Sequence, residues 1–129
     1  MRRALLVLLV VGCTSTARAQ VVNPTRATFT ASADHTATVG AVAVLDHYQL
    51  DVMVGTPTGA LAFTFGLGKP TPAADNSITI PVPPLATLAS GLYVATVSAV
   101  GPGGTGRSVP SDPFARVASA AAPGKPTIQ

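Results

Sequence analysis

Short runs in which apolar and polar residues alternate constrain this chain more than any other feature. A period of two is the pattern of a β-strand that buries one of its faces. Glycine, proline, asparagine and aspartate stand between the runs, as they do in the turns that connect strands. The pattern predicts strands over residues 26–32, 45–54, 61–67, 78–82, 92–100 and 107–117.

The run 45–54 separates its two faces most clearly. Its predicted apolar face carries Tyr48, Leu50, Val52 and Val54. Its predicted polar face carries His47, Gln49 and Asp51. Pro81 in the run 78–82 cannot donate a ladder hydrogen bond, so this strand is predicted at an edge of its sheet. Residues 38–45 are apolar without a clear period, and we predict a long loop or a strand extension there.

Composition supports an all-β domain. The 129 residues include 12 glycines and 12 prolines, which disfavour long helices. The five acidic residues are all aspartates, and glutamate, which helical proteins use heavily, does not occur. A chain of this length forms one domain, with room for appendages at its ends.

Residues 1–19 have the composition of an export signal. Two arginines precede an apolar run over residues 4–11, and residues 17–19 (Ala-Arg-Ala) supply a cleavage pattern before Gln20. The apolar run is shorter than the roughly 20 residues that span a bilayer. We therefore predict a signal peptide over residues 1–19 and a secreted or periplasmic protein.

Cys13 leaves a second address open. Residues 10–13 (Val-Val-Gly-Cys) resemble the bacterial lipobox, in which the cysteine is acylated and becomes the first residue. In this alternative the protein is a cell-surface lipoprotein, held at the membrane through Cys13. Cleavage after Ala19 would instead leave no cysteine, and export without a disulfide indicates a bacterial protein.

The formal charge of +3 belongs to the predicted signal peptide. Three of the eight basic residues are Arg2, Arg3 and Arg18, which leaves five basic residues against five acidic ones in residues 20–129. A formally neutral domain gives no electrostatic reason for a polyanionic ligand. We therefore expect no nucleic-acid partner.

One stretch, residues 88–111, carries a series of motifs that belong together. They are a leucine, a glycine turn, a tyrosine that opens an alternating strand, a glycine-rich loop and a Ser-x-x-Ser pair: Leu88, Gly91, Tyr93, residues 101–106, and Ser108 with Ser111. This series resembles the second half of a fibronectin type III domain, and residues 45–50 resemble the third strand of that family.

The resemblance implies a seven-stranded immunoglobulin-like β-sandwich over residues 20–118, followed by a flexible tail over residues 119–129. It also implies structural roles for Tyr48, Leu88 and Tyr93. In the family, the hydroxyl at the position of Tyr93 ties the corner before its strand back to nearby backbone.

The chain departs from the family at one core position. The family usually carries a tryptophan late in its second strand, where this chain has Ala31. An unfilled hole of that size would cost roughly 3–5 kcal/mol. We therefore expect Phe29, Phe63 or Phe65 to fill the volume.

Two patterns in the chain are candidates for chemistry. Residues 101–106 match a dinucleotide-binding glycine motif, but the proline-containing residues after them cannot form the helix that such a site needs. Asp34-His35 and Asp46-His47 could hold a metal or pair a base with an orienting carboxylate. Neighbours on a strand point to opposite faces, so we expect Asp46 not to orient His47.

We expect no enzyme and no cofactor. Two histidines with scattered aspartates fall short of a zinc spacing, and the chain has neither a Gly-x-Ser-x-Gly elbow nor a pair of glutamates. A metal-dependent hydrolase that uses the two Asp-His pairs stays open as an alternative.

Modules of the resembled family usually bind through loops at one end, here residues 33–44 and 101–107. The residues expected to face a ligand are His35, Thr36, Gly103, Thr105 and Arg107. We therefore predict an exported, monomeric, non-catalytic interaction or spacer module, whose partner is a protein or a glycan at the cell surface.

Overall fold

The computed structural model describes residues 19–82 and 85–129. Strands make up 46% of the structure, and the helical content of these residues is a short 3-10 turn, η1 (Leu85–Thr87), so the prediction of an all-β fold is confirmed. Most of the predicted signal peptide, with Cys13, lies outside the described residues. Within the described part of the chain, no helix is long and apolar enough to cross a membrane.

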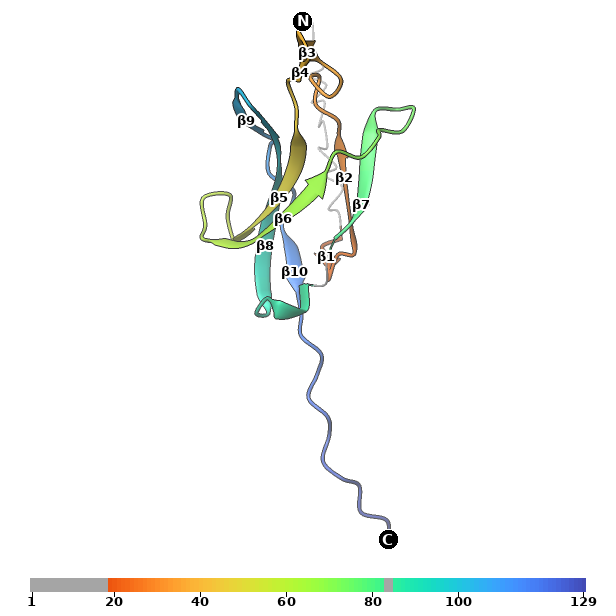
Figure 1. Cartoon of the computed structure of the whole chain (residues 1–129). Coiled ribbons are helices and arrows are strands. Elements are labelled where there is room, and N and C mark those ends of the chain that lie inside the picture. The colour runs from red at the N-terminus through yellow and green to blue at the C-terminus, as the bar shows by residue number, and fades with distance from the viewer. Residues whose placement is uncertain (1–18, 83–84) are drawn as a thin grey trace, which may run out of the picture.

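The larger of the two main sheets is built around the longest strand, β8. Adjacent strands of this sheet pair antiparallel, except that β1 runs parallel to β10. Strand β9 pairs with the end of β8 (Figure 1). In spatial order the sheet contains β1 (Val21–Val22), β10 (Phe114–Arg116), β8 (Gly91–Gly101), β5 (His47–Val54) and β6 (Leu61–Gly68), with β9 (Gly104–Arg107) beside β8.

A smaller sheet covers one face of the larger sheet. It consists of β2 (Arg26–Thr30) and β7 (Ser77–Pro81), which pair antiparallel. At one end of the molecule a short hairpin of β3 (Thr38–Val39) and β4 (Val42–Ala43) projects beyond both sheets (Figure 1). The tail leaves from the opposite end, and its residues 118–129 are all exposed.

The core between the sheets forms two clusters of buried side chains. In the first, Ile78 and Ile80 of β7 pack with Tyr48 of β5, and the ring of Phe29 meets the ring of Tyr48 edge-on at 5.1 Å between centroids. In the second, the side chain of η1 packs against side chains of β5, β8 and β10 of the larger sheet, and phenylalanines of β6 pack beside them. The second cluster contains Leu50, Val52, Leu85, Tyr93 and Phe114, with Phe63 and Phe65 against it.

The three phenylalanines expected to fill the core are therefore divided between the clusters. Phe29 packs beside Ala31 in the first, whereas Phe63 and Phe65 pack in the second. Of the three rings, only Phe29 packs against the cluster that contains Ala31.

Two tyrosines fasten backbone to the core. The hydroxyl of Tyr93 donates a 2.6 Å hydrogen bond to the carbonyl of Ala89, which is the bond that the resemblance implies at the corner before β8. Leu88 lies half-buried against the second cluster. The hydroxyl of Tyr48 accepts a 3.0 Å hydrogen bond from the backbone N–H of Ser32 and so holds the chain that follows β2.

The predicted strands lie where the alternation placed them, with one division. The run 107–117 is not one strand: Pro110 and Pro113 cannot donate ladder bonds, and within the run only Arg107 and β10 (Phe114–Arg116) are in strands. Strand β9 instead occupies residues 104–107, which were predicted to be part of a loop. Between the two strands, the hydroxyls of Ser108 and Ser111 accept hydrogen bonds from the backbone of β8 at 3.0 Å each. The Ser-x-x-Ser pair thus replaces part of the missing ladder.

Two sequence predictions about exposure were wrong. Val54 lies on the same face as Val52, since it pairs with Tyr93 as Val52 pairs with Ala95, but at the end of the strand it is 49% exposed. Asp51, placed on a solvent-facing side, is buried. Residues 38–43 form the β3–β4 hairpin, and Pro81 lies in an edge strand as predicted.

Candidate functional site

The loops predicted to bind a ligand meet at the β3–β4 end of the molecule. A hollow of about 380 Å³ lies between the chain after β2, the chain before β5 and the β8–β9 hairpin. Of the five predicted ligand-facing residues, Gly103 and Thr105 line this hollow together with Asp34. His35, Thr36 and Arg107 do not line it.

His35 is engaged with the core. Its Nδ1 lies 2.8 Å from the hydroxyl of Tyr48, and the two rings stack with their centroids 5.7 Å apart. Because that hydroxyl already accepts a hydrogen bond from Ser32, it can donate its own proton to the imidazole. His35 therefore fastens the loop to β5, while Thr36 beside it is exposed.

Arg107 belongs to a network on the outer face of the larger sheet. Its Nη2 lies 3.2 Å from Oδ2 of Asp51, whose side chain is only 6% exposed. The other carboxylate oxygen accepts hydrogen bonds of 3.0 Å from the side chains of Gln49 and Thr64. The network joins β5, β6 and β9, and both carboxylate oxygens already have donors, so we interpret it as a structural tie.

Thr96 of β8 is a second buried polar residue beside Asp51. It lies directly opposite Asp51 on β8, and its hydroxyl is buried without a hydrogen-bond partner among the residues that the structure describes.

Sequence reasoning placed Asp51 correctly on the outer face and missed its burial. The available signal was an aspartate in the middle of a long apolar strand, where a charge is expensive unless it is paired.

The expectation that Asp46 does not orient His47 was wrong. Oδ2 of Asp46 lies 3.2 Å from Nδ1 of His47, with both side chains at least partly exposed. Asp46 precedes β5, so the rule of opposite faces within a strand does not apply to it. Residues 19–82 and 85–129 contain no group of three or more metal-ligating side chains around this pair.

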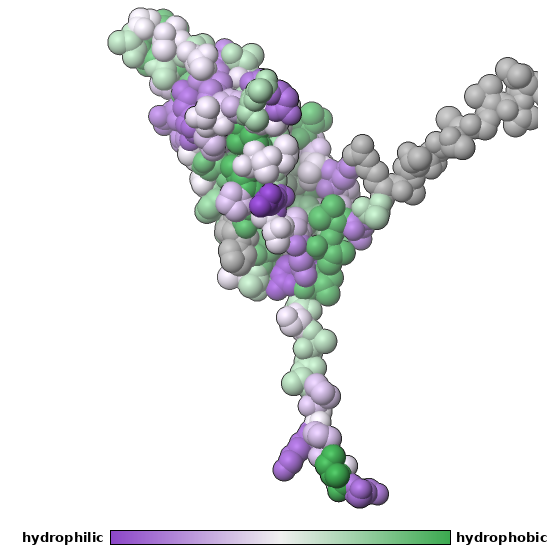
Figure 2. Space-filling view, turned by 90° about the vertical axis from the view of Figure 1, so that its right-hand side faces the viewer, coloured by the Kyte–Doolittle hydropathy of each residue, from purple (hydrophilic) through white to green (hydrophobic). Residues whose placement is uncertain are grey.

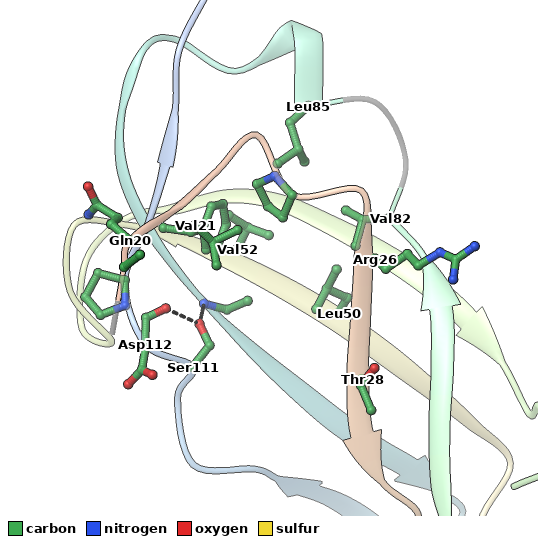
Figure 3. Close-up of a pocket in the computed structure, with 16 residues that line it drawn as sticks. Gln20, Val21, Arg26, Thr28, Leu50, Val52, Val82, Leu85, Ser111 and Asp112 are labelled. Carbon is green, nitrogen blue, oxygen red and sulfur yellow. Dashed lines mark hydrogen bonds between the residues drawn. The ribbon is translucent and has the colours of Figure 1, made fainter. Parts of the chain in front are cut away.

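A larger open groove of about 690 Å³ lies between β2 and the strands β10 and β1. Figure 3 shows Leu50 and Val52 of β5 beneath it, Val82 and Leu85 at one side, and Gln20 with Asp112 at the opposite lip. Ala95 of β8 and Phe114 of β10 complete its apolar lining. The groove reaches the second core cluster, because the smaller sheet stops at β2 and leaves the inner face of β8 and β10 uncovered on this side.

One titratable group away from both hollows has a resolved electrostatic shift. The hydroxyl of Ser77 donates a 2.6 Å hydrogen bond to the Asp75 carboxylate, and the Ser77 backbone N–H donates another at 3.1 Å. These bonds to the charged form hold the pKa of Asp75 below its ordinary value. The arrangement closes the turn before β7.

The fold and these sites define a class of protein, an all-β domain of two facing sheets with an open side. No protein-family model, curated protein or solved structure matches the chain. What the protein does must therefore be inferred from the geometry of its own residues.

Proposed function

We propose that the chain is an exported, non-catalytic interaction module of the fibronectin type III kind. Its sheet order supports the proposal: β10-β8-β5-β6 facing β2-β7 corresponds to the order G-F-C-C′ facing B-E of immunoglobulin-like sandwiches. The hydrogen bond from Tyr93 to Ala89 is the corner contact of that architecture. On this assignment seven strands of the sandwich correspond to β2, β5, β6, β7, β8, β10 and the short β1.

The observation that carries the binding role is the meeting of two distant loops at one end. Residues 33–44 and the β8–β9 hairpin surround the 380 Å³ hollow. Beside it, the β3–β4 hairpin exposes Val39 and Val42 to 75% and 57%. Exposed apolar side chains gathered on one projection are typical of a surface that meets a partner, and the tip of the body in Figure 2 carries apolar and weakly polar residues.

We propose that this end binds a protein or a glycan at the cell surface. The test compares binding of the purified chain to a glycan array and to surface proteins of the producing cell. A double variant, Val39→Ser with Val42→Ser, should lose binding at least tenfold. Val109→Ser and Ile128→Ser make the same change at two exposed positions outside this end and should bind like the parent. Equal binding by all variants would remove the loop end from the proposal.

The proposed address is secreted or periplasmic, with Cys13 acylation as the alternative. The order of residues in the first nineteen positions supports it, and mass spectrometry of the native amino terminus tests it. A chain that begins at Gln20 excludes the lipid anchor. A chain that begins at an acylated Cys13 excludes free secretion.

A metal-dependent hydrolase is the rival, favoured by the Asp46–His47 contact at 3.2 Å. Metal analysis of the purified protein and thermal shifts with zinc or calcium separate the two. A stoichiometric ion that is lost in His35→Ala or His47→Ala would contradict a purely non-catalytic module. The proposal expects no bound ion and no shift.

A further inference from the structure

We propose that the groove beside β2 is an acceptor site for an extended peptide segment of a partner, which adds to β2 as the third strand of the smaller sheet. The inference rests on the proposed function in one respect, that the domain is an interaction module. It names a second surface, away from the loop end, and a chemical class of ligand.

The free edge of β2 offers backbone hydrogen bonds at strand spacing. The carbonyl of Thr25 and the N–H of Ala31 bond to the β7 side, to Val82 and Asn76. Because bonding directions alternate along an antiparallel strand, the backbone groups of residues 25, 27, 29 and 31 face β7. Those of Arg26, Thr28 and Thr30 face away from it, toward the groove side. Among the described residues β2 pairs with no other strand.

The free edges of β7, β1 and β6 carry features that oppose pairing. In β7, Pro81 stands opposite Arg26, so its nitrogen faces the outer edge of the smaller sheet and offers no donor there. Strand β1 has two residues and is followed by Pro24, and the pairing of β6 contains two register shifts. Strand β2 contains no proline, and its one charged residue is Arg26 at its first position. Natural edge strands are usually protected by such devices, so an edge whose one charge lies at its end, beside an apolar groove, favours pairing with a further strand.

The groove specifies the side chains of the occupant. An added strand places alternate side chains on the inner face, where Leu50, Val52 and Leu85 form an apolar floor. A volume of about 690 Å³ falls within the 300–1,000 Å³ of ligand pockets. Apolar residues at alternate positions of the partner would therefore enter the groove, with polar residues between them facing solvent.

Charge adds a preference at one end. Arg26 is exposed on the outer face of β2 and makes no ion pair with any residue in the described part of the chain. An acidic residue of the partner on the same face would lie across from it, and opposite charges on adjacent strands stabilise pairing. The occupant is thus an extended segment with alternating apolar residues and a carboxylate near Arg26.

The described segments of this chain do not supply that strand. Residues 19–21 line the opposite lip of the groove, and β1 pairs with β10. The tail leaves from the end of β10, and its residues 118–129 are exposed along their whole length (Figure 1). We therefore assign the occupant to a partner, by β-strand addition.

The test uses the full chain and a fluorescent blocked heptapeptide, acetyl-Asp-Val-Thr-Val-Thr-Val-Asp-amide. The acid at each end places a carboxylate near Arg26 in either strand direction. Fluorescence anisotropy should show saturable binding, and a peptide with lysine in place of both aspartates should bind several-fold more weakly at low salt. The same peptide with N-methylated backbone amides, which cannot donate to β2, should not bind.

The chain offers a matched pair of variants. Thr28 and Thr79 stand directly opposite each other, share a hydroxyl hydrogen bond of 2.8 Å, and direct their backbone groups toward opposite edges of the smaller sheet. Thr28→Pro removes a donor from the groove edge and should weaken peptide binding at least tenfold. Thr79→Pro causes the same loss of the shared hydroxyl bond and should leave peptide binding within twofold.

Ala95→Leu provides a second variant that does not touch the backbone of β2. The larger side chain enters the groove from β8 and should also weaken binding at least tenfold. The loop-end variant at Val39 and Val42 should bind the peptide normally, so failure here is distinguishable from failure of the proposed loop function.

Four outcomes would overturn the proposal. The first is absence of peptide binding to the parent chain, and the second is an equal effect of Thr28→Pro and Thr79→Pro. The third is a dimer in sedimentation that Thr28→Pro dissociates, which would make a second copy the occupant. The fourth is peptide binding that occurs only after residues 1–19 are removed, which would assign the groove to the chain's own amino-terminal segment.

Discussion

At the scale of single residues, Asp51 shows how one carboxylate can join three strands. It receives hydrogen bonds from Gln49 on its own strand, Thr64 on β6 and Arg107 at the end of β9. A buried carboxylate without partners is expensive, whereas one with three donors contributes to stability and fixes the register of its neighbours. The same network removes Arg107 from the loop end, where the sequence had suggested a ligand-facing charge.

Asp51→Ala should therefore destabilise the protein by about 1–3 kcal/mol, because three side chains lose their shared acceptor and the buried carboxylate leaves a space. Arg107→Ala should cost about 1 kcal/mol, since the exposed arginine is partly replaced by water. Urea unfolding measures both. Asp46→Ala, at a carboxylate that is 75% exposed, is the control and should stay within about 0.5 kcal/mol. Equal costs at Asp51 and Asp46 would contradict a structural network.

Asp75 gives a pH prediction with a definite sign. Its folded pKa is lowered chiefly by the side-chain hydrogen bond from Ser77 and then by the Ser77 backbone N–H. A lowered carboxyl pKa stabilises the fold fully above the pKa of the unfolded chain, about 3.9, and this stabilisation is lost as pH falls through the folded value. Ser77→Ala should raise the pKa of Asp75 in a carboxyl NMR titration. An unchanged pKa would assign the shift to the backbone bond alone.

At the scale of elements, the alternation predicted the strands well because most of them bury one face and expose the other. The β3–β4 hairpin escaped because its valines are exposed on both strands, so no buried face imposes a period on residues 38–43. The exposure of Val54 was missed because it depends on how far the neighbouring elements cover the end of β5. The pattern of one run does not contain that information.

The β8–β9 hairpin tests how closely elements are packed. A Cβ at Gly101 would lie 1.9 Å from the carbonyl oxygen of Val44, whereas a Cβ at Gly103 would meet nothing within 4 Å. Gly101→Ala should therefore cost about 1–3 kcal/mol, as overpacking usually does. Gly103→Ala should change stability by less than about 0.5 kcal/mol. Thermal unfolding compares the two variants. Similar melting temperatures would mean that the hairpin does not pack closely against the chain before β5.

At the scale of the whole molecule, the two hollows could not be predicted from the sequence. The loop end was anticipated through the resemblance, and two of its five residues line the hollow there. The groove exists because the smaller sheet ends at β2 while β1 pairs with β10, in which the partners Val21 and Phe114 are 93 residues apart in the chain. Alternation places Leu50 and Val52 in the core but does not say that one side of that core stays open.

An open side should reduce the stability of the isolated domain, because apolar side chains at the groove lack neighbours. Ala95→Leu fills part of that space and should stabilise the protein by about 0.5–2 kcal/mol, as cavity-filling substitutions commonly do. Ala95→Ser leaves the groove open and should not stabilise. If the groove accepts a partner strand, the stabilised variant should be the one that no longer binds the heptapeptide. A loss of stability in Ala95→Leu would mean that the space is closed in solution, and the groove would then have no room for a strand.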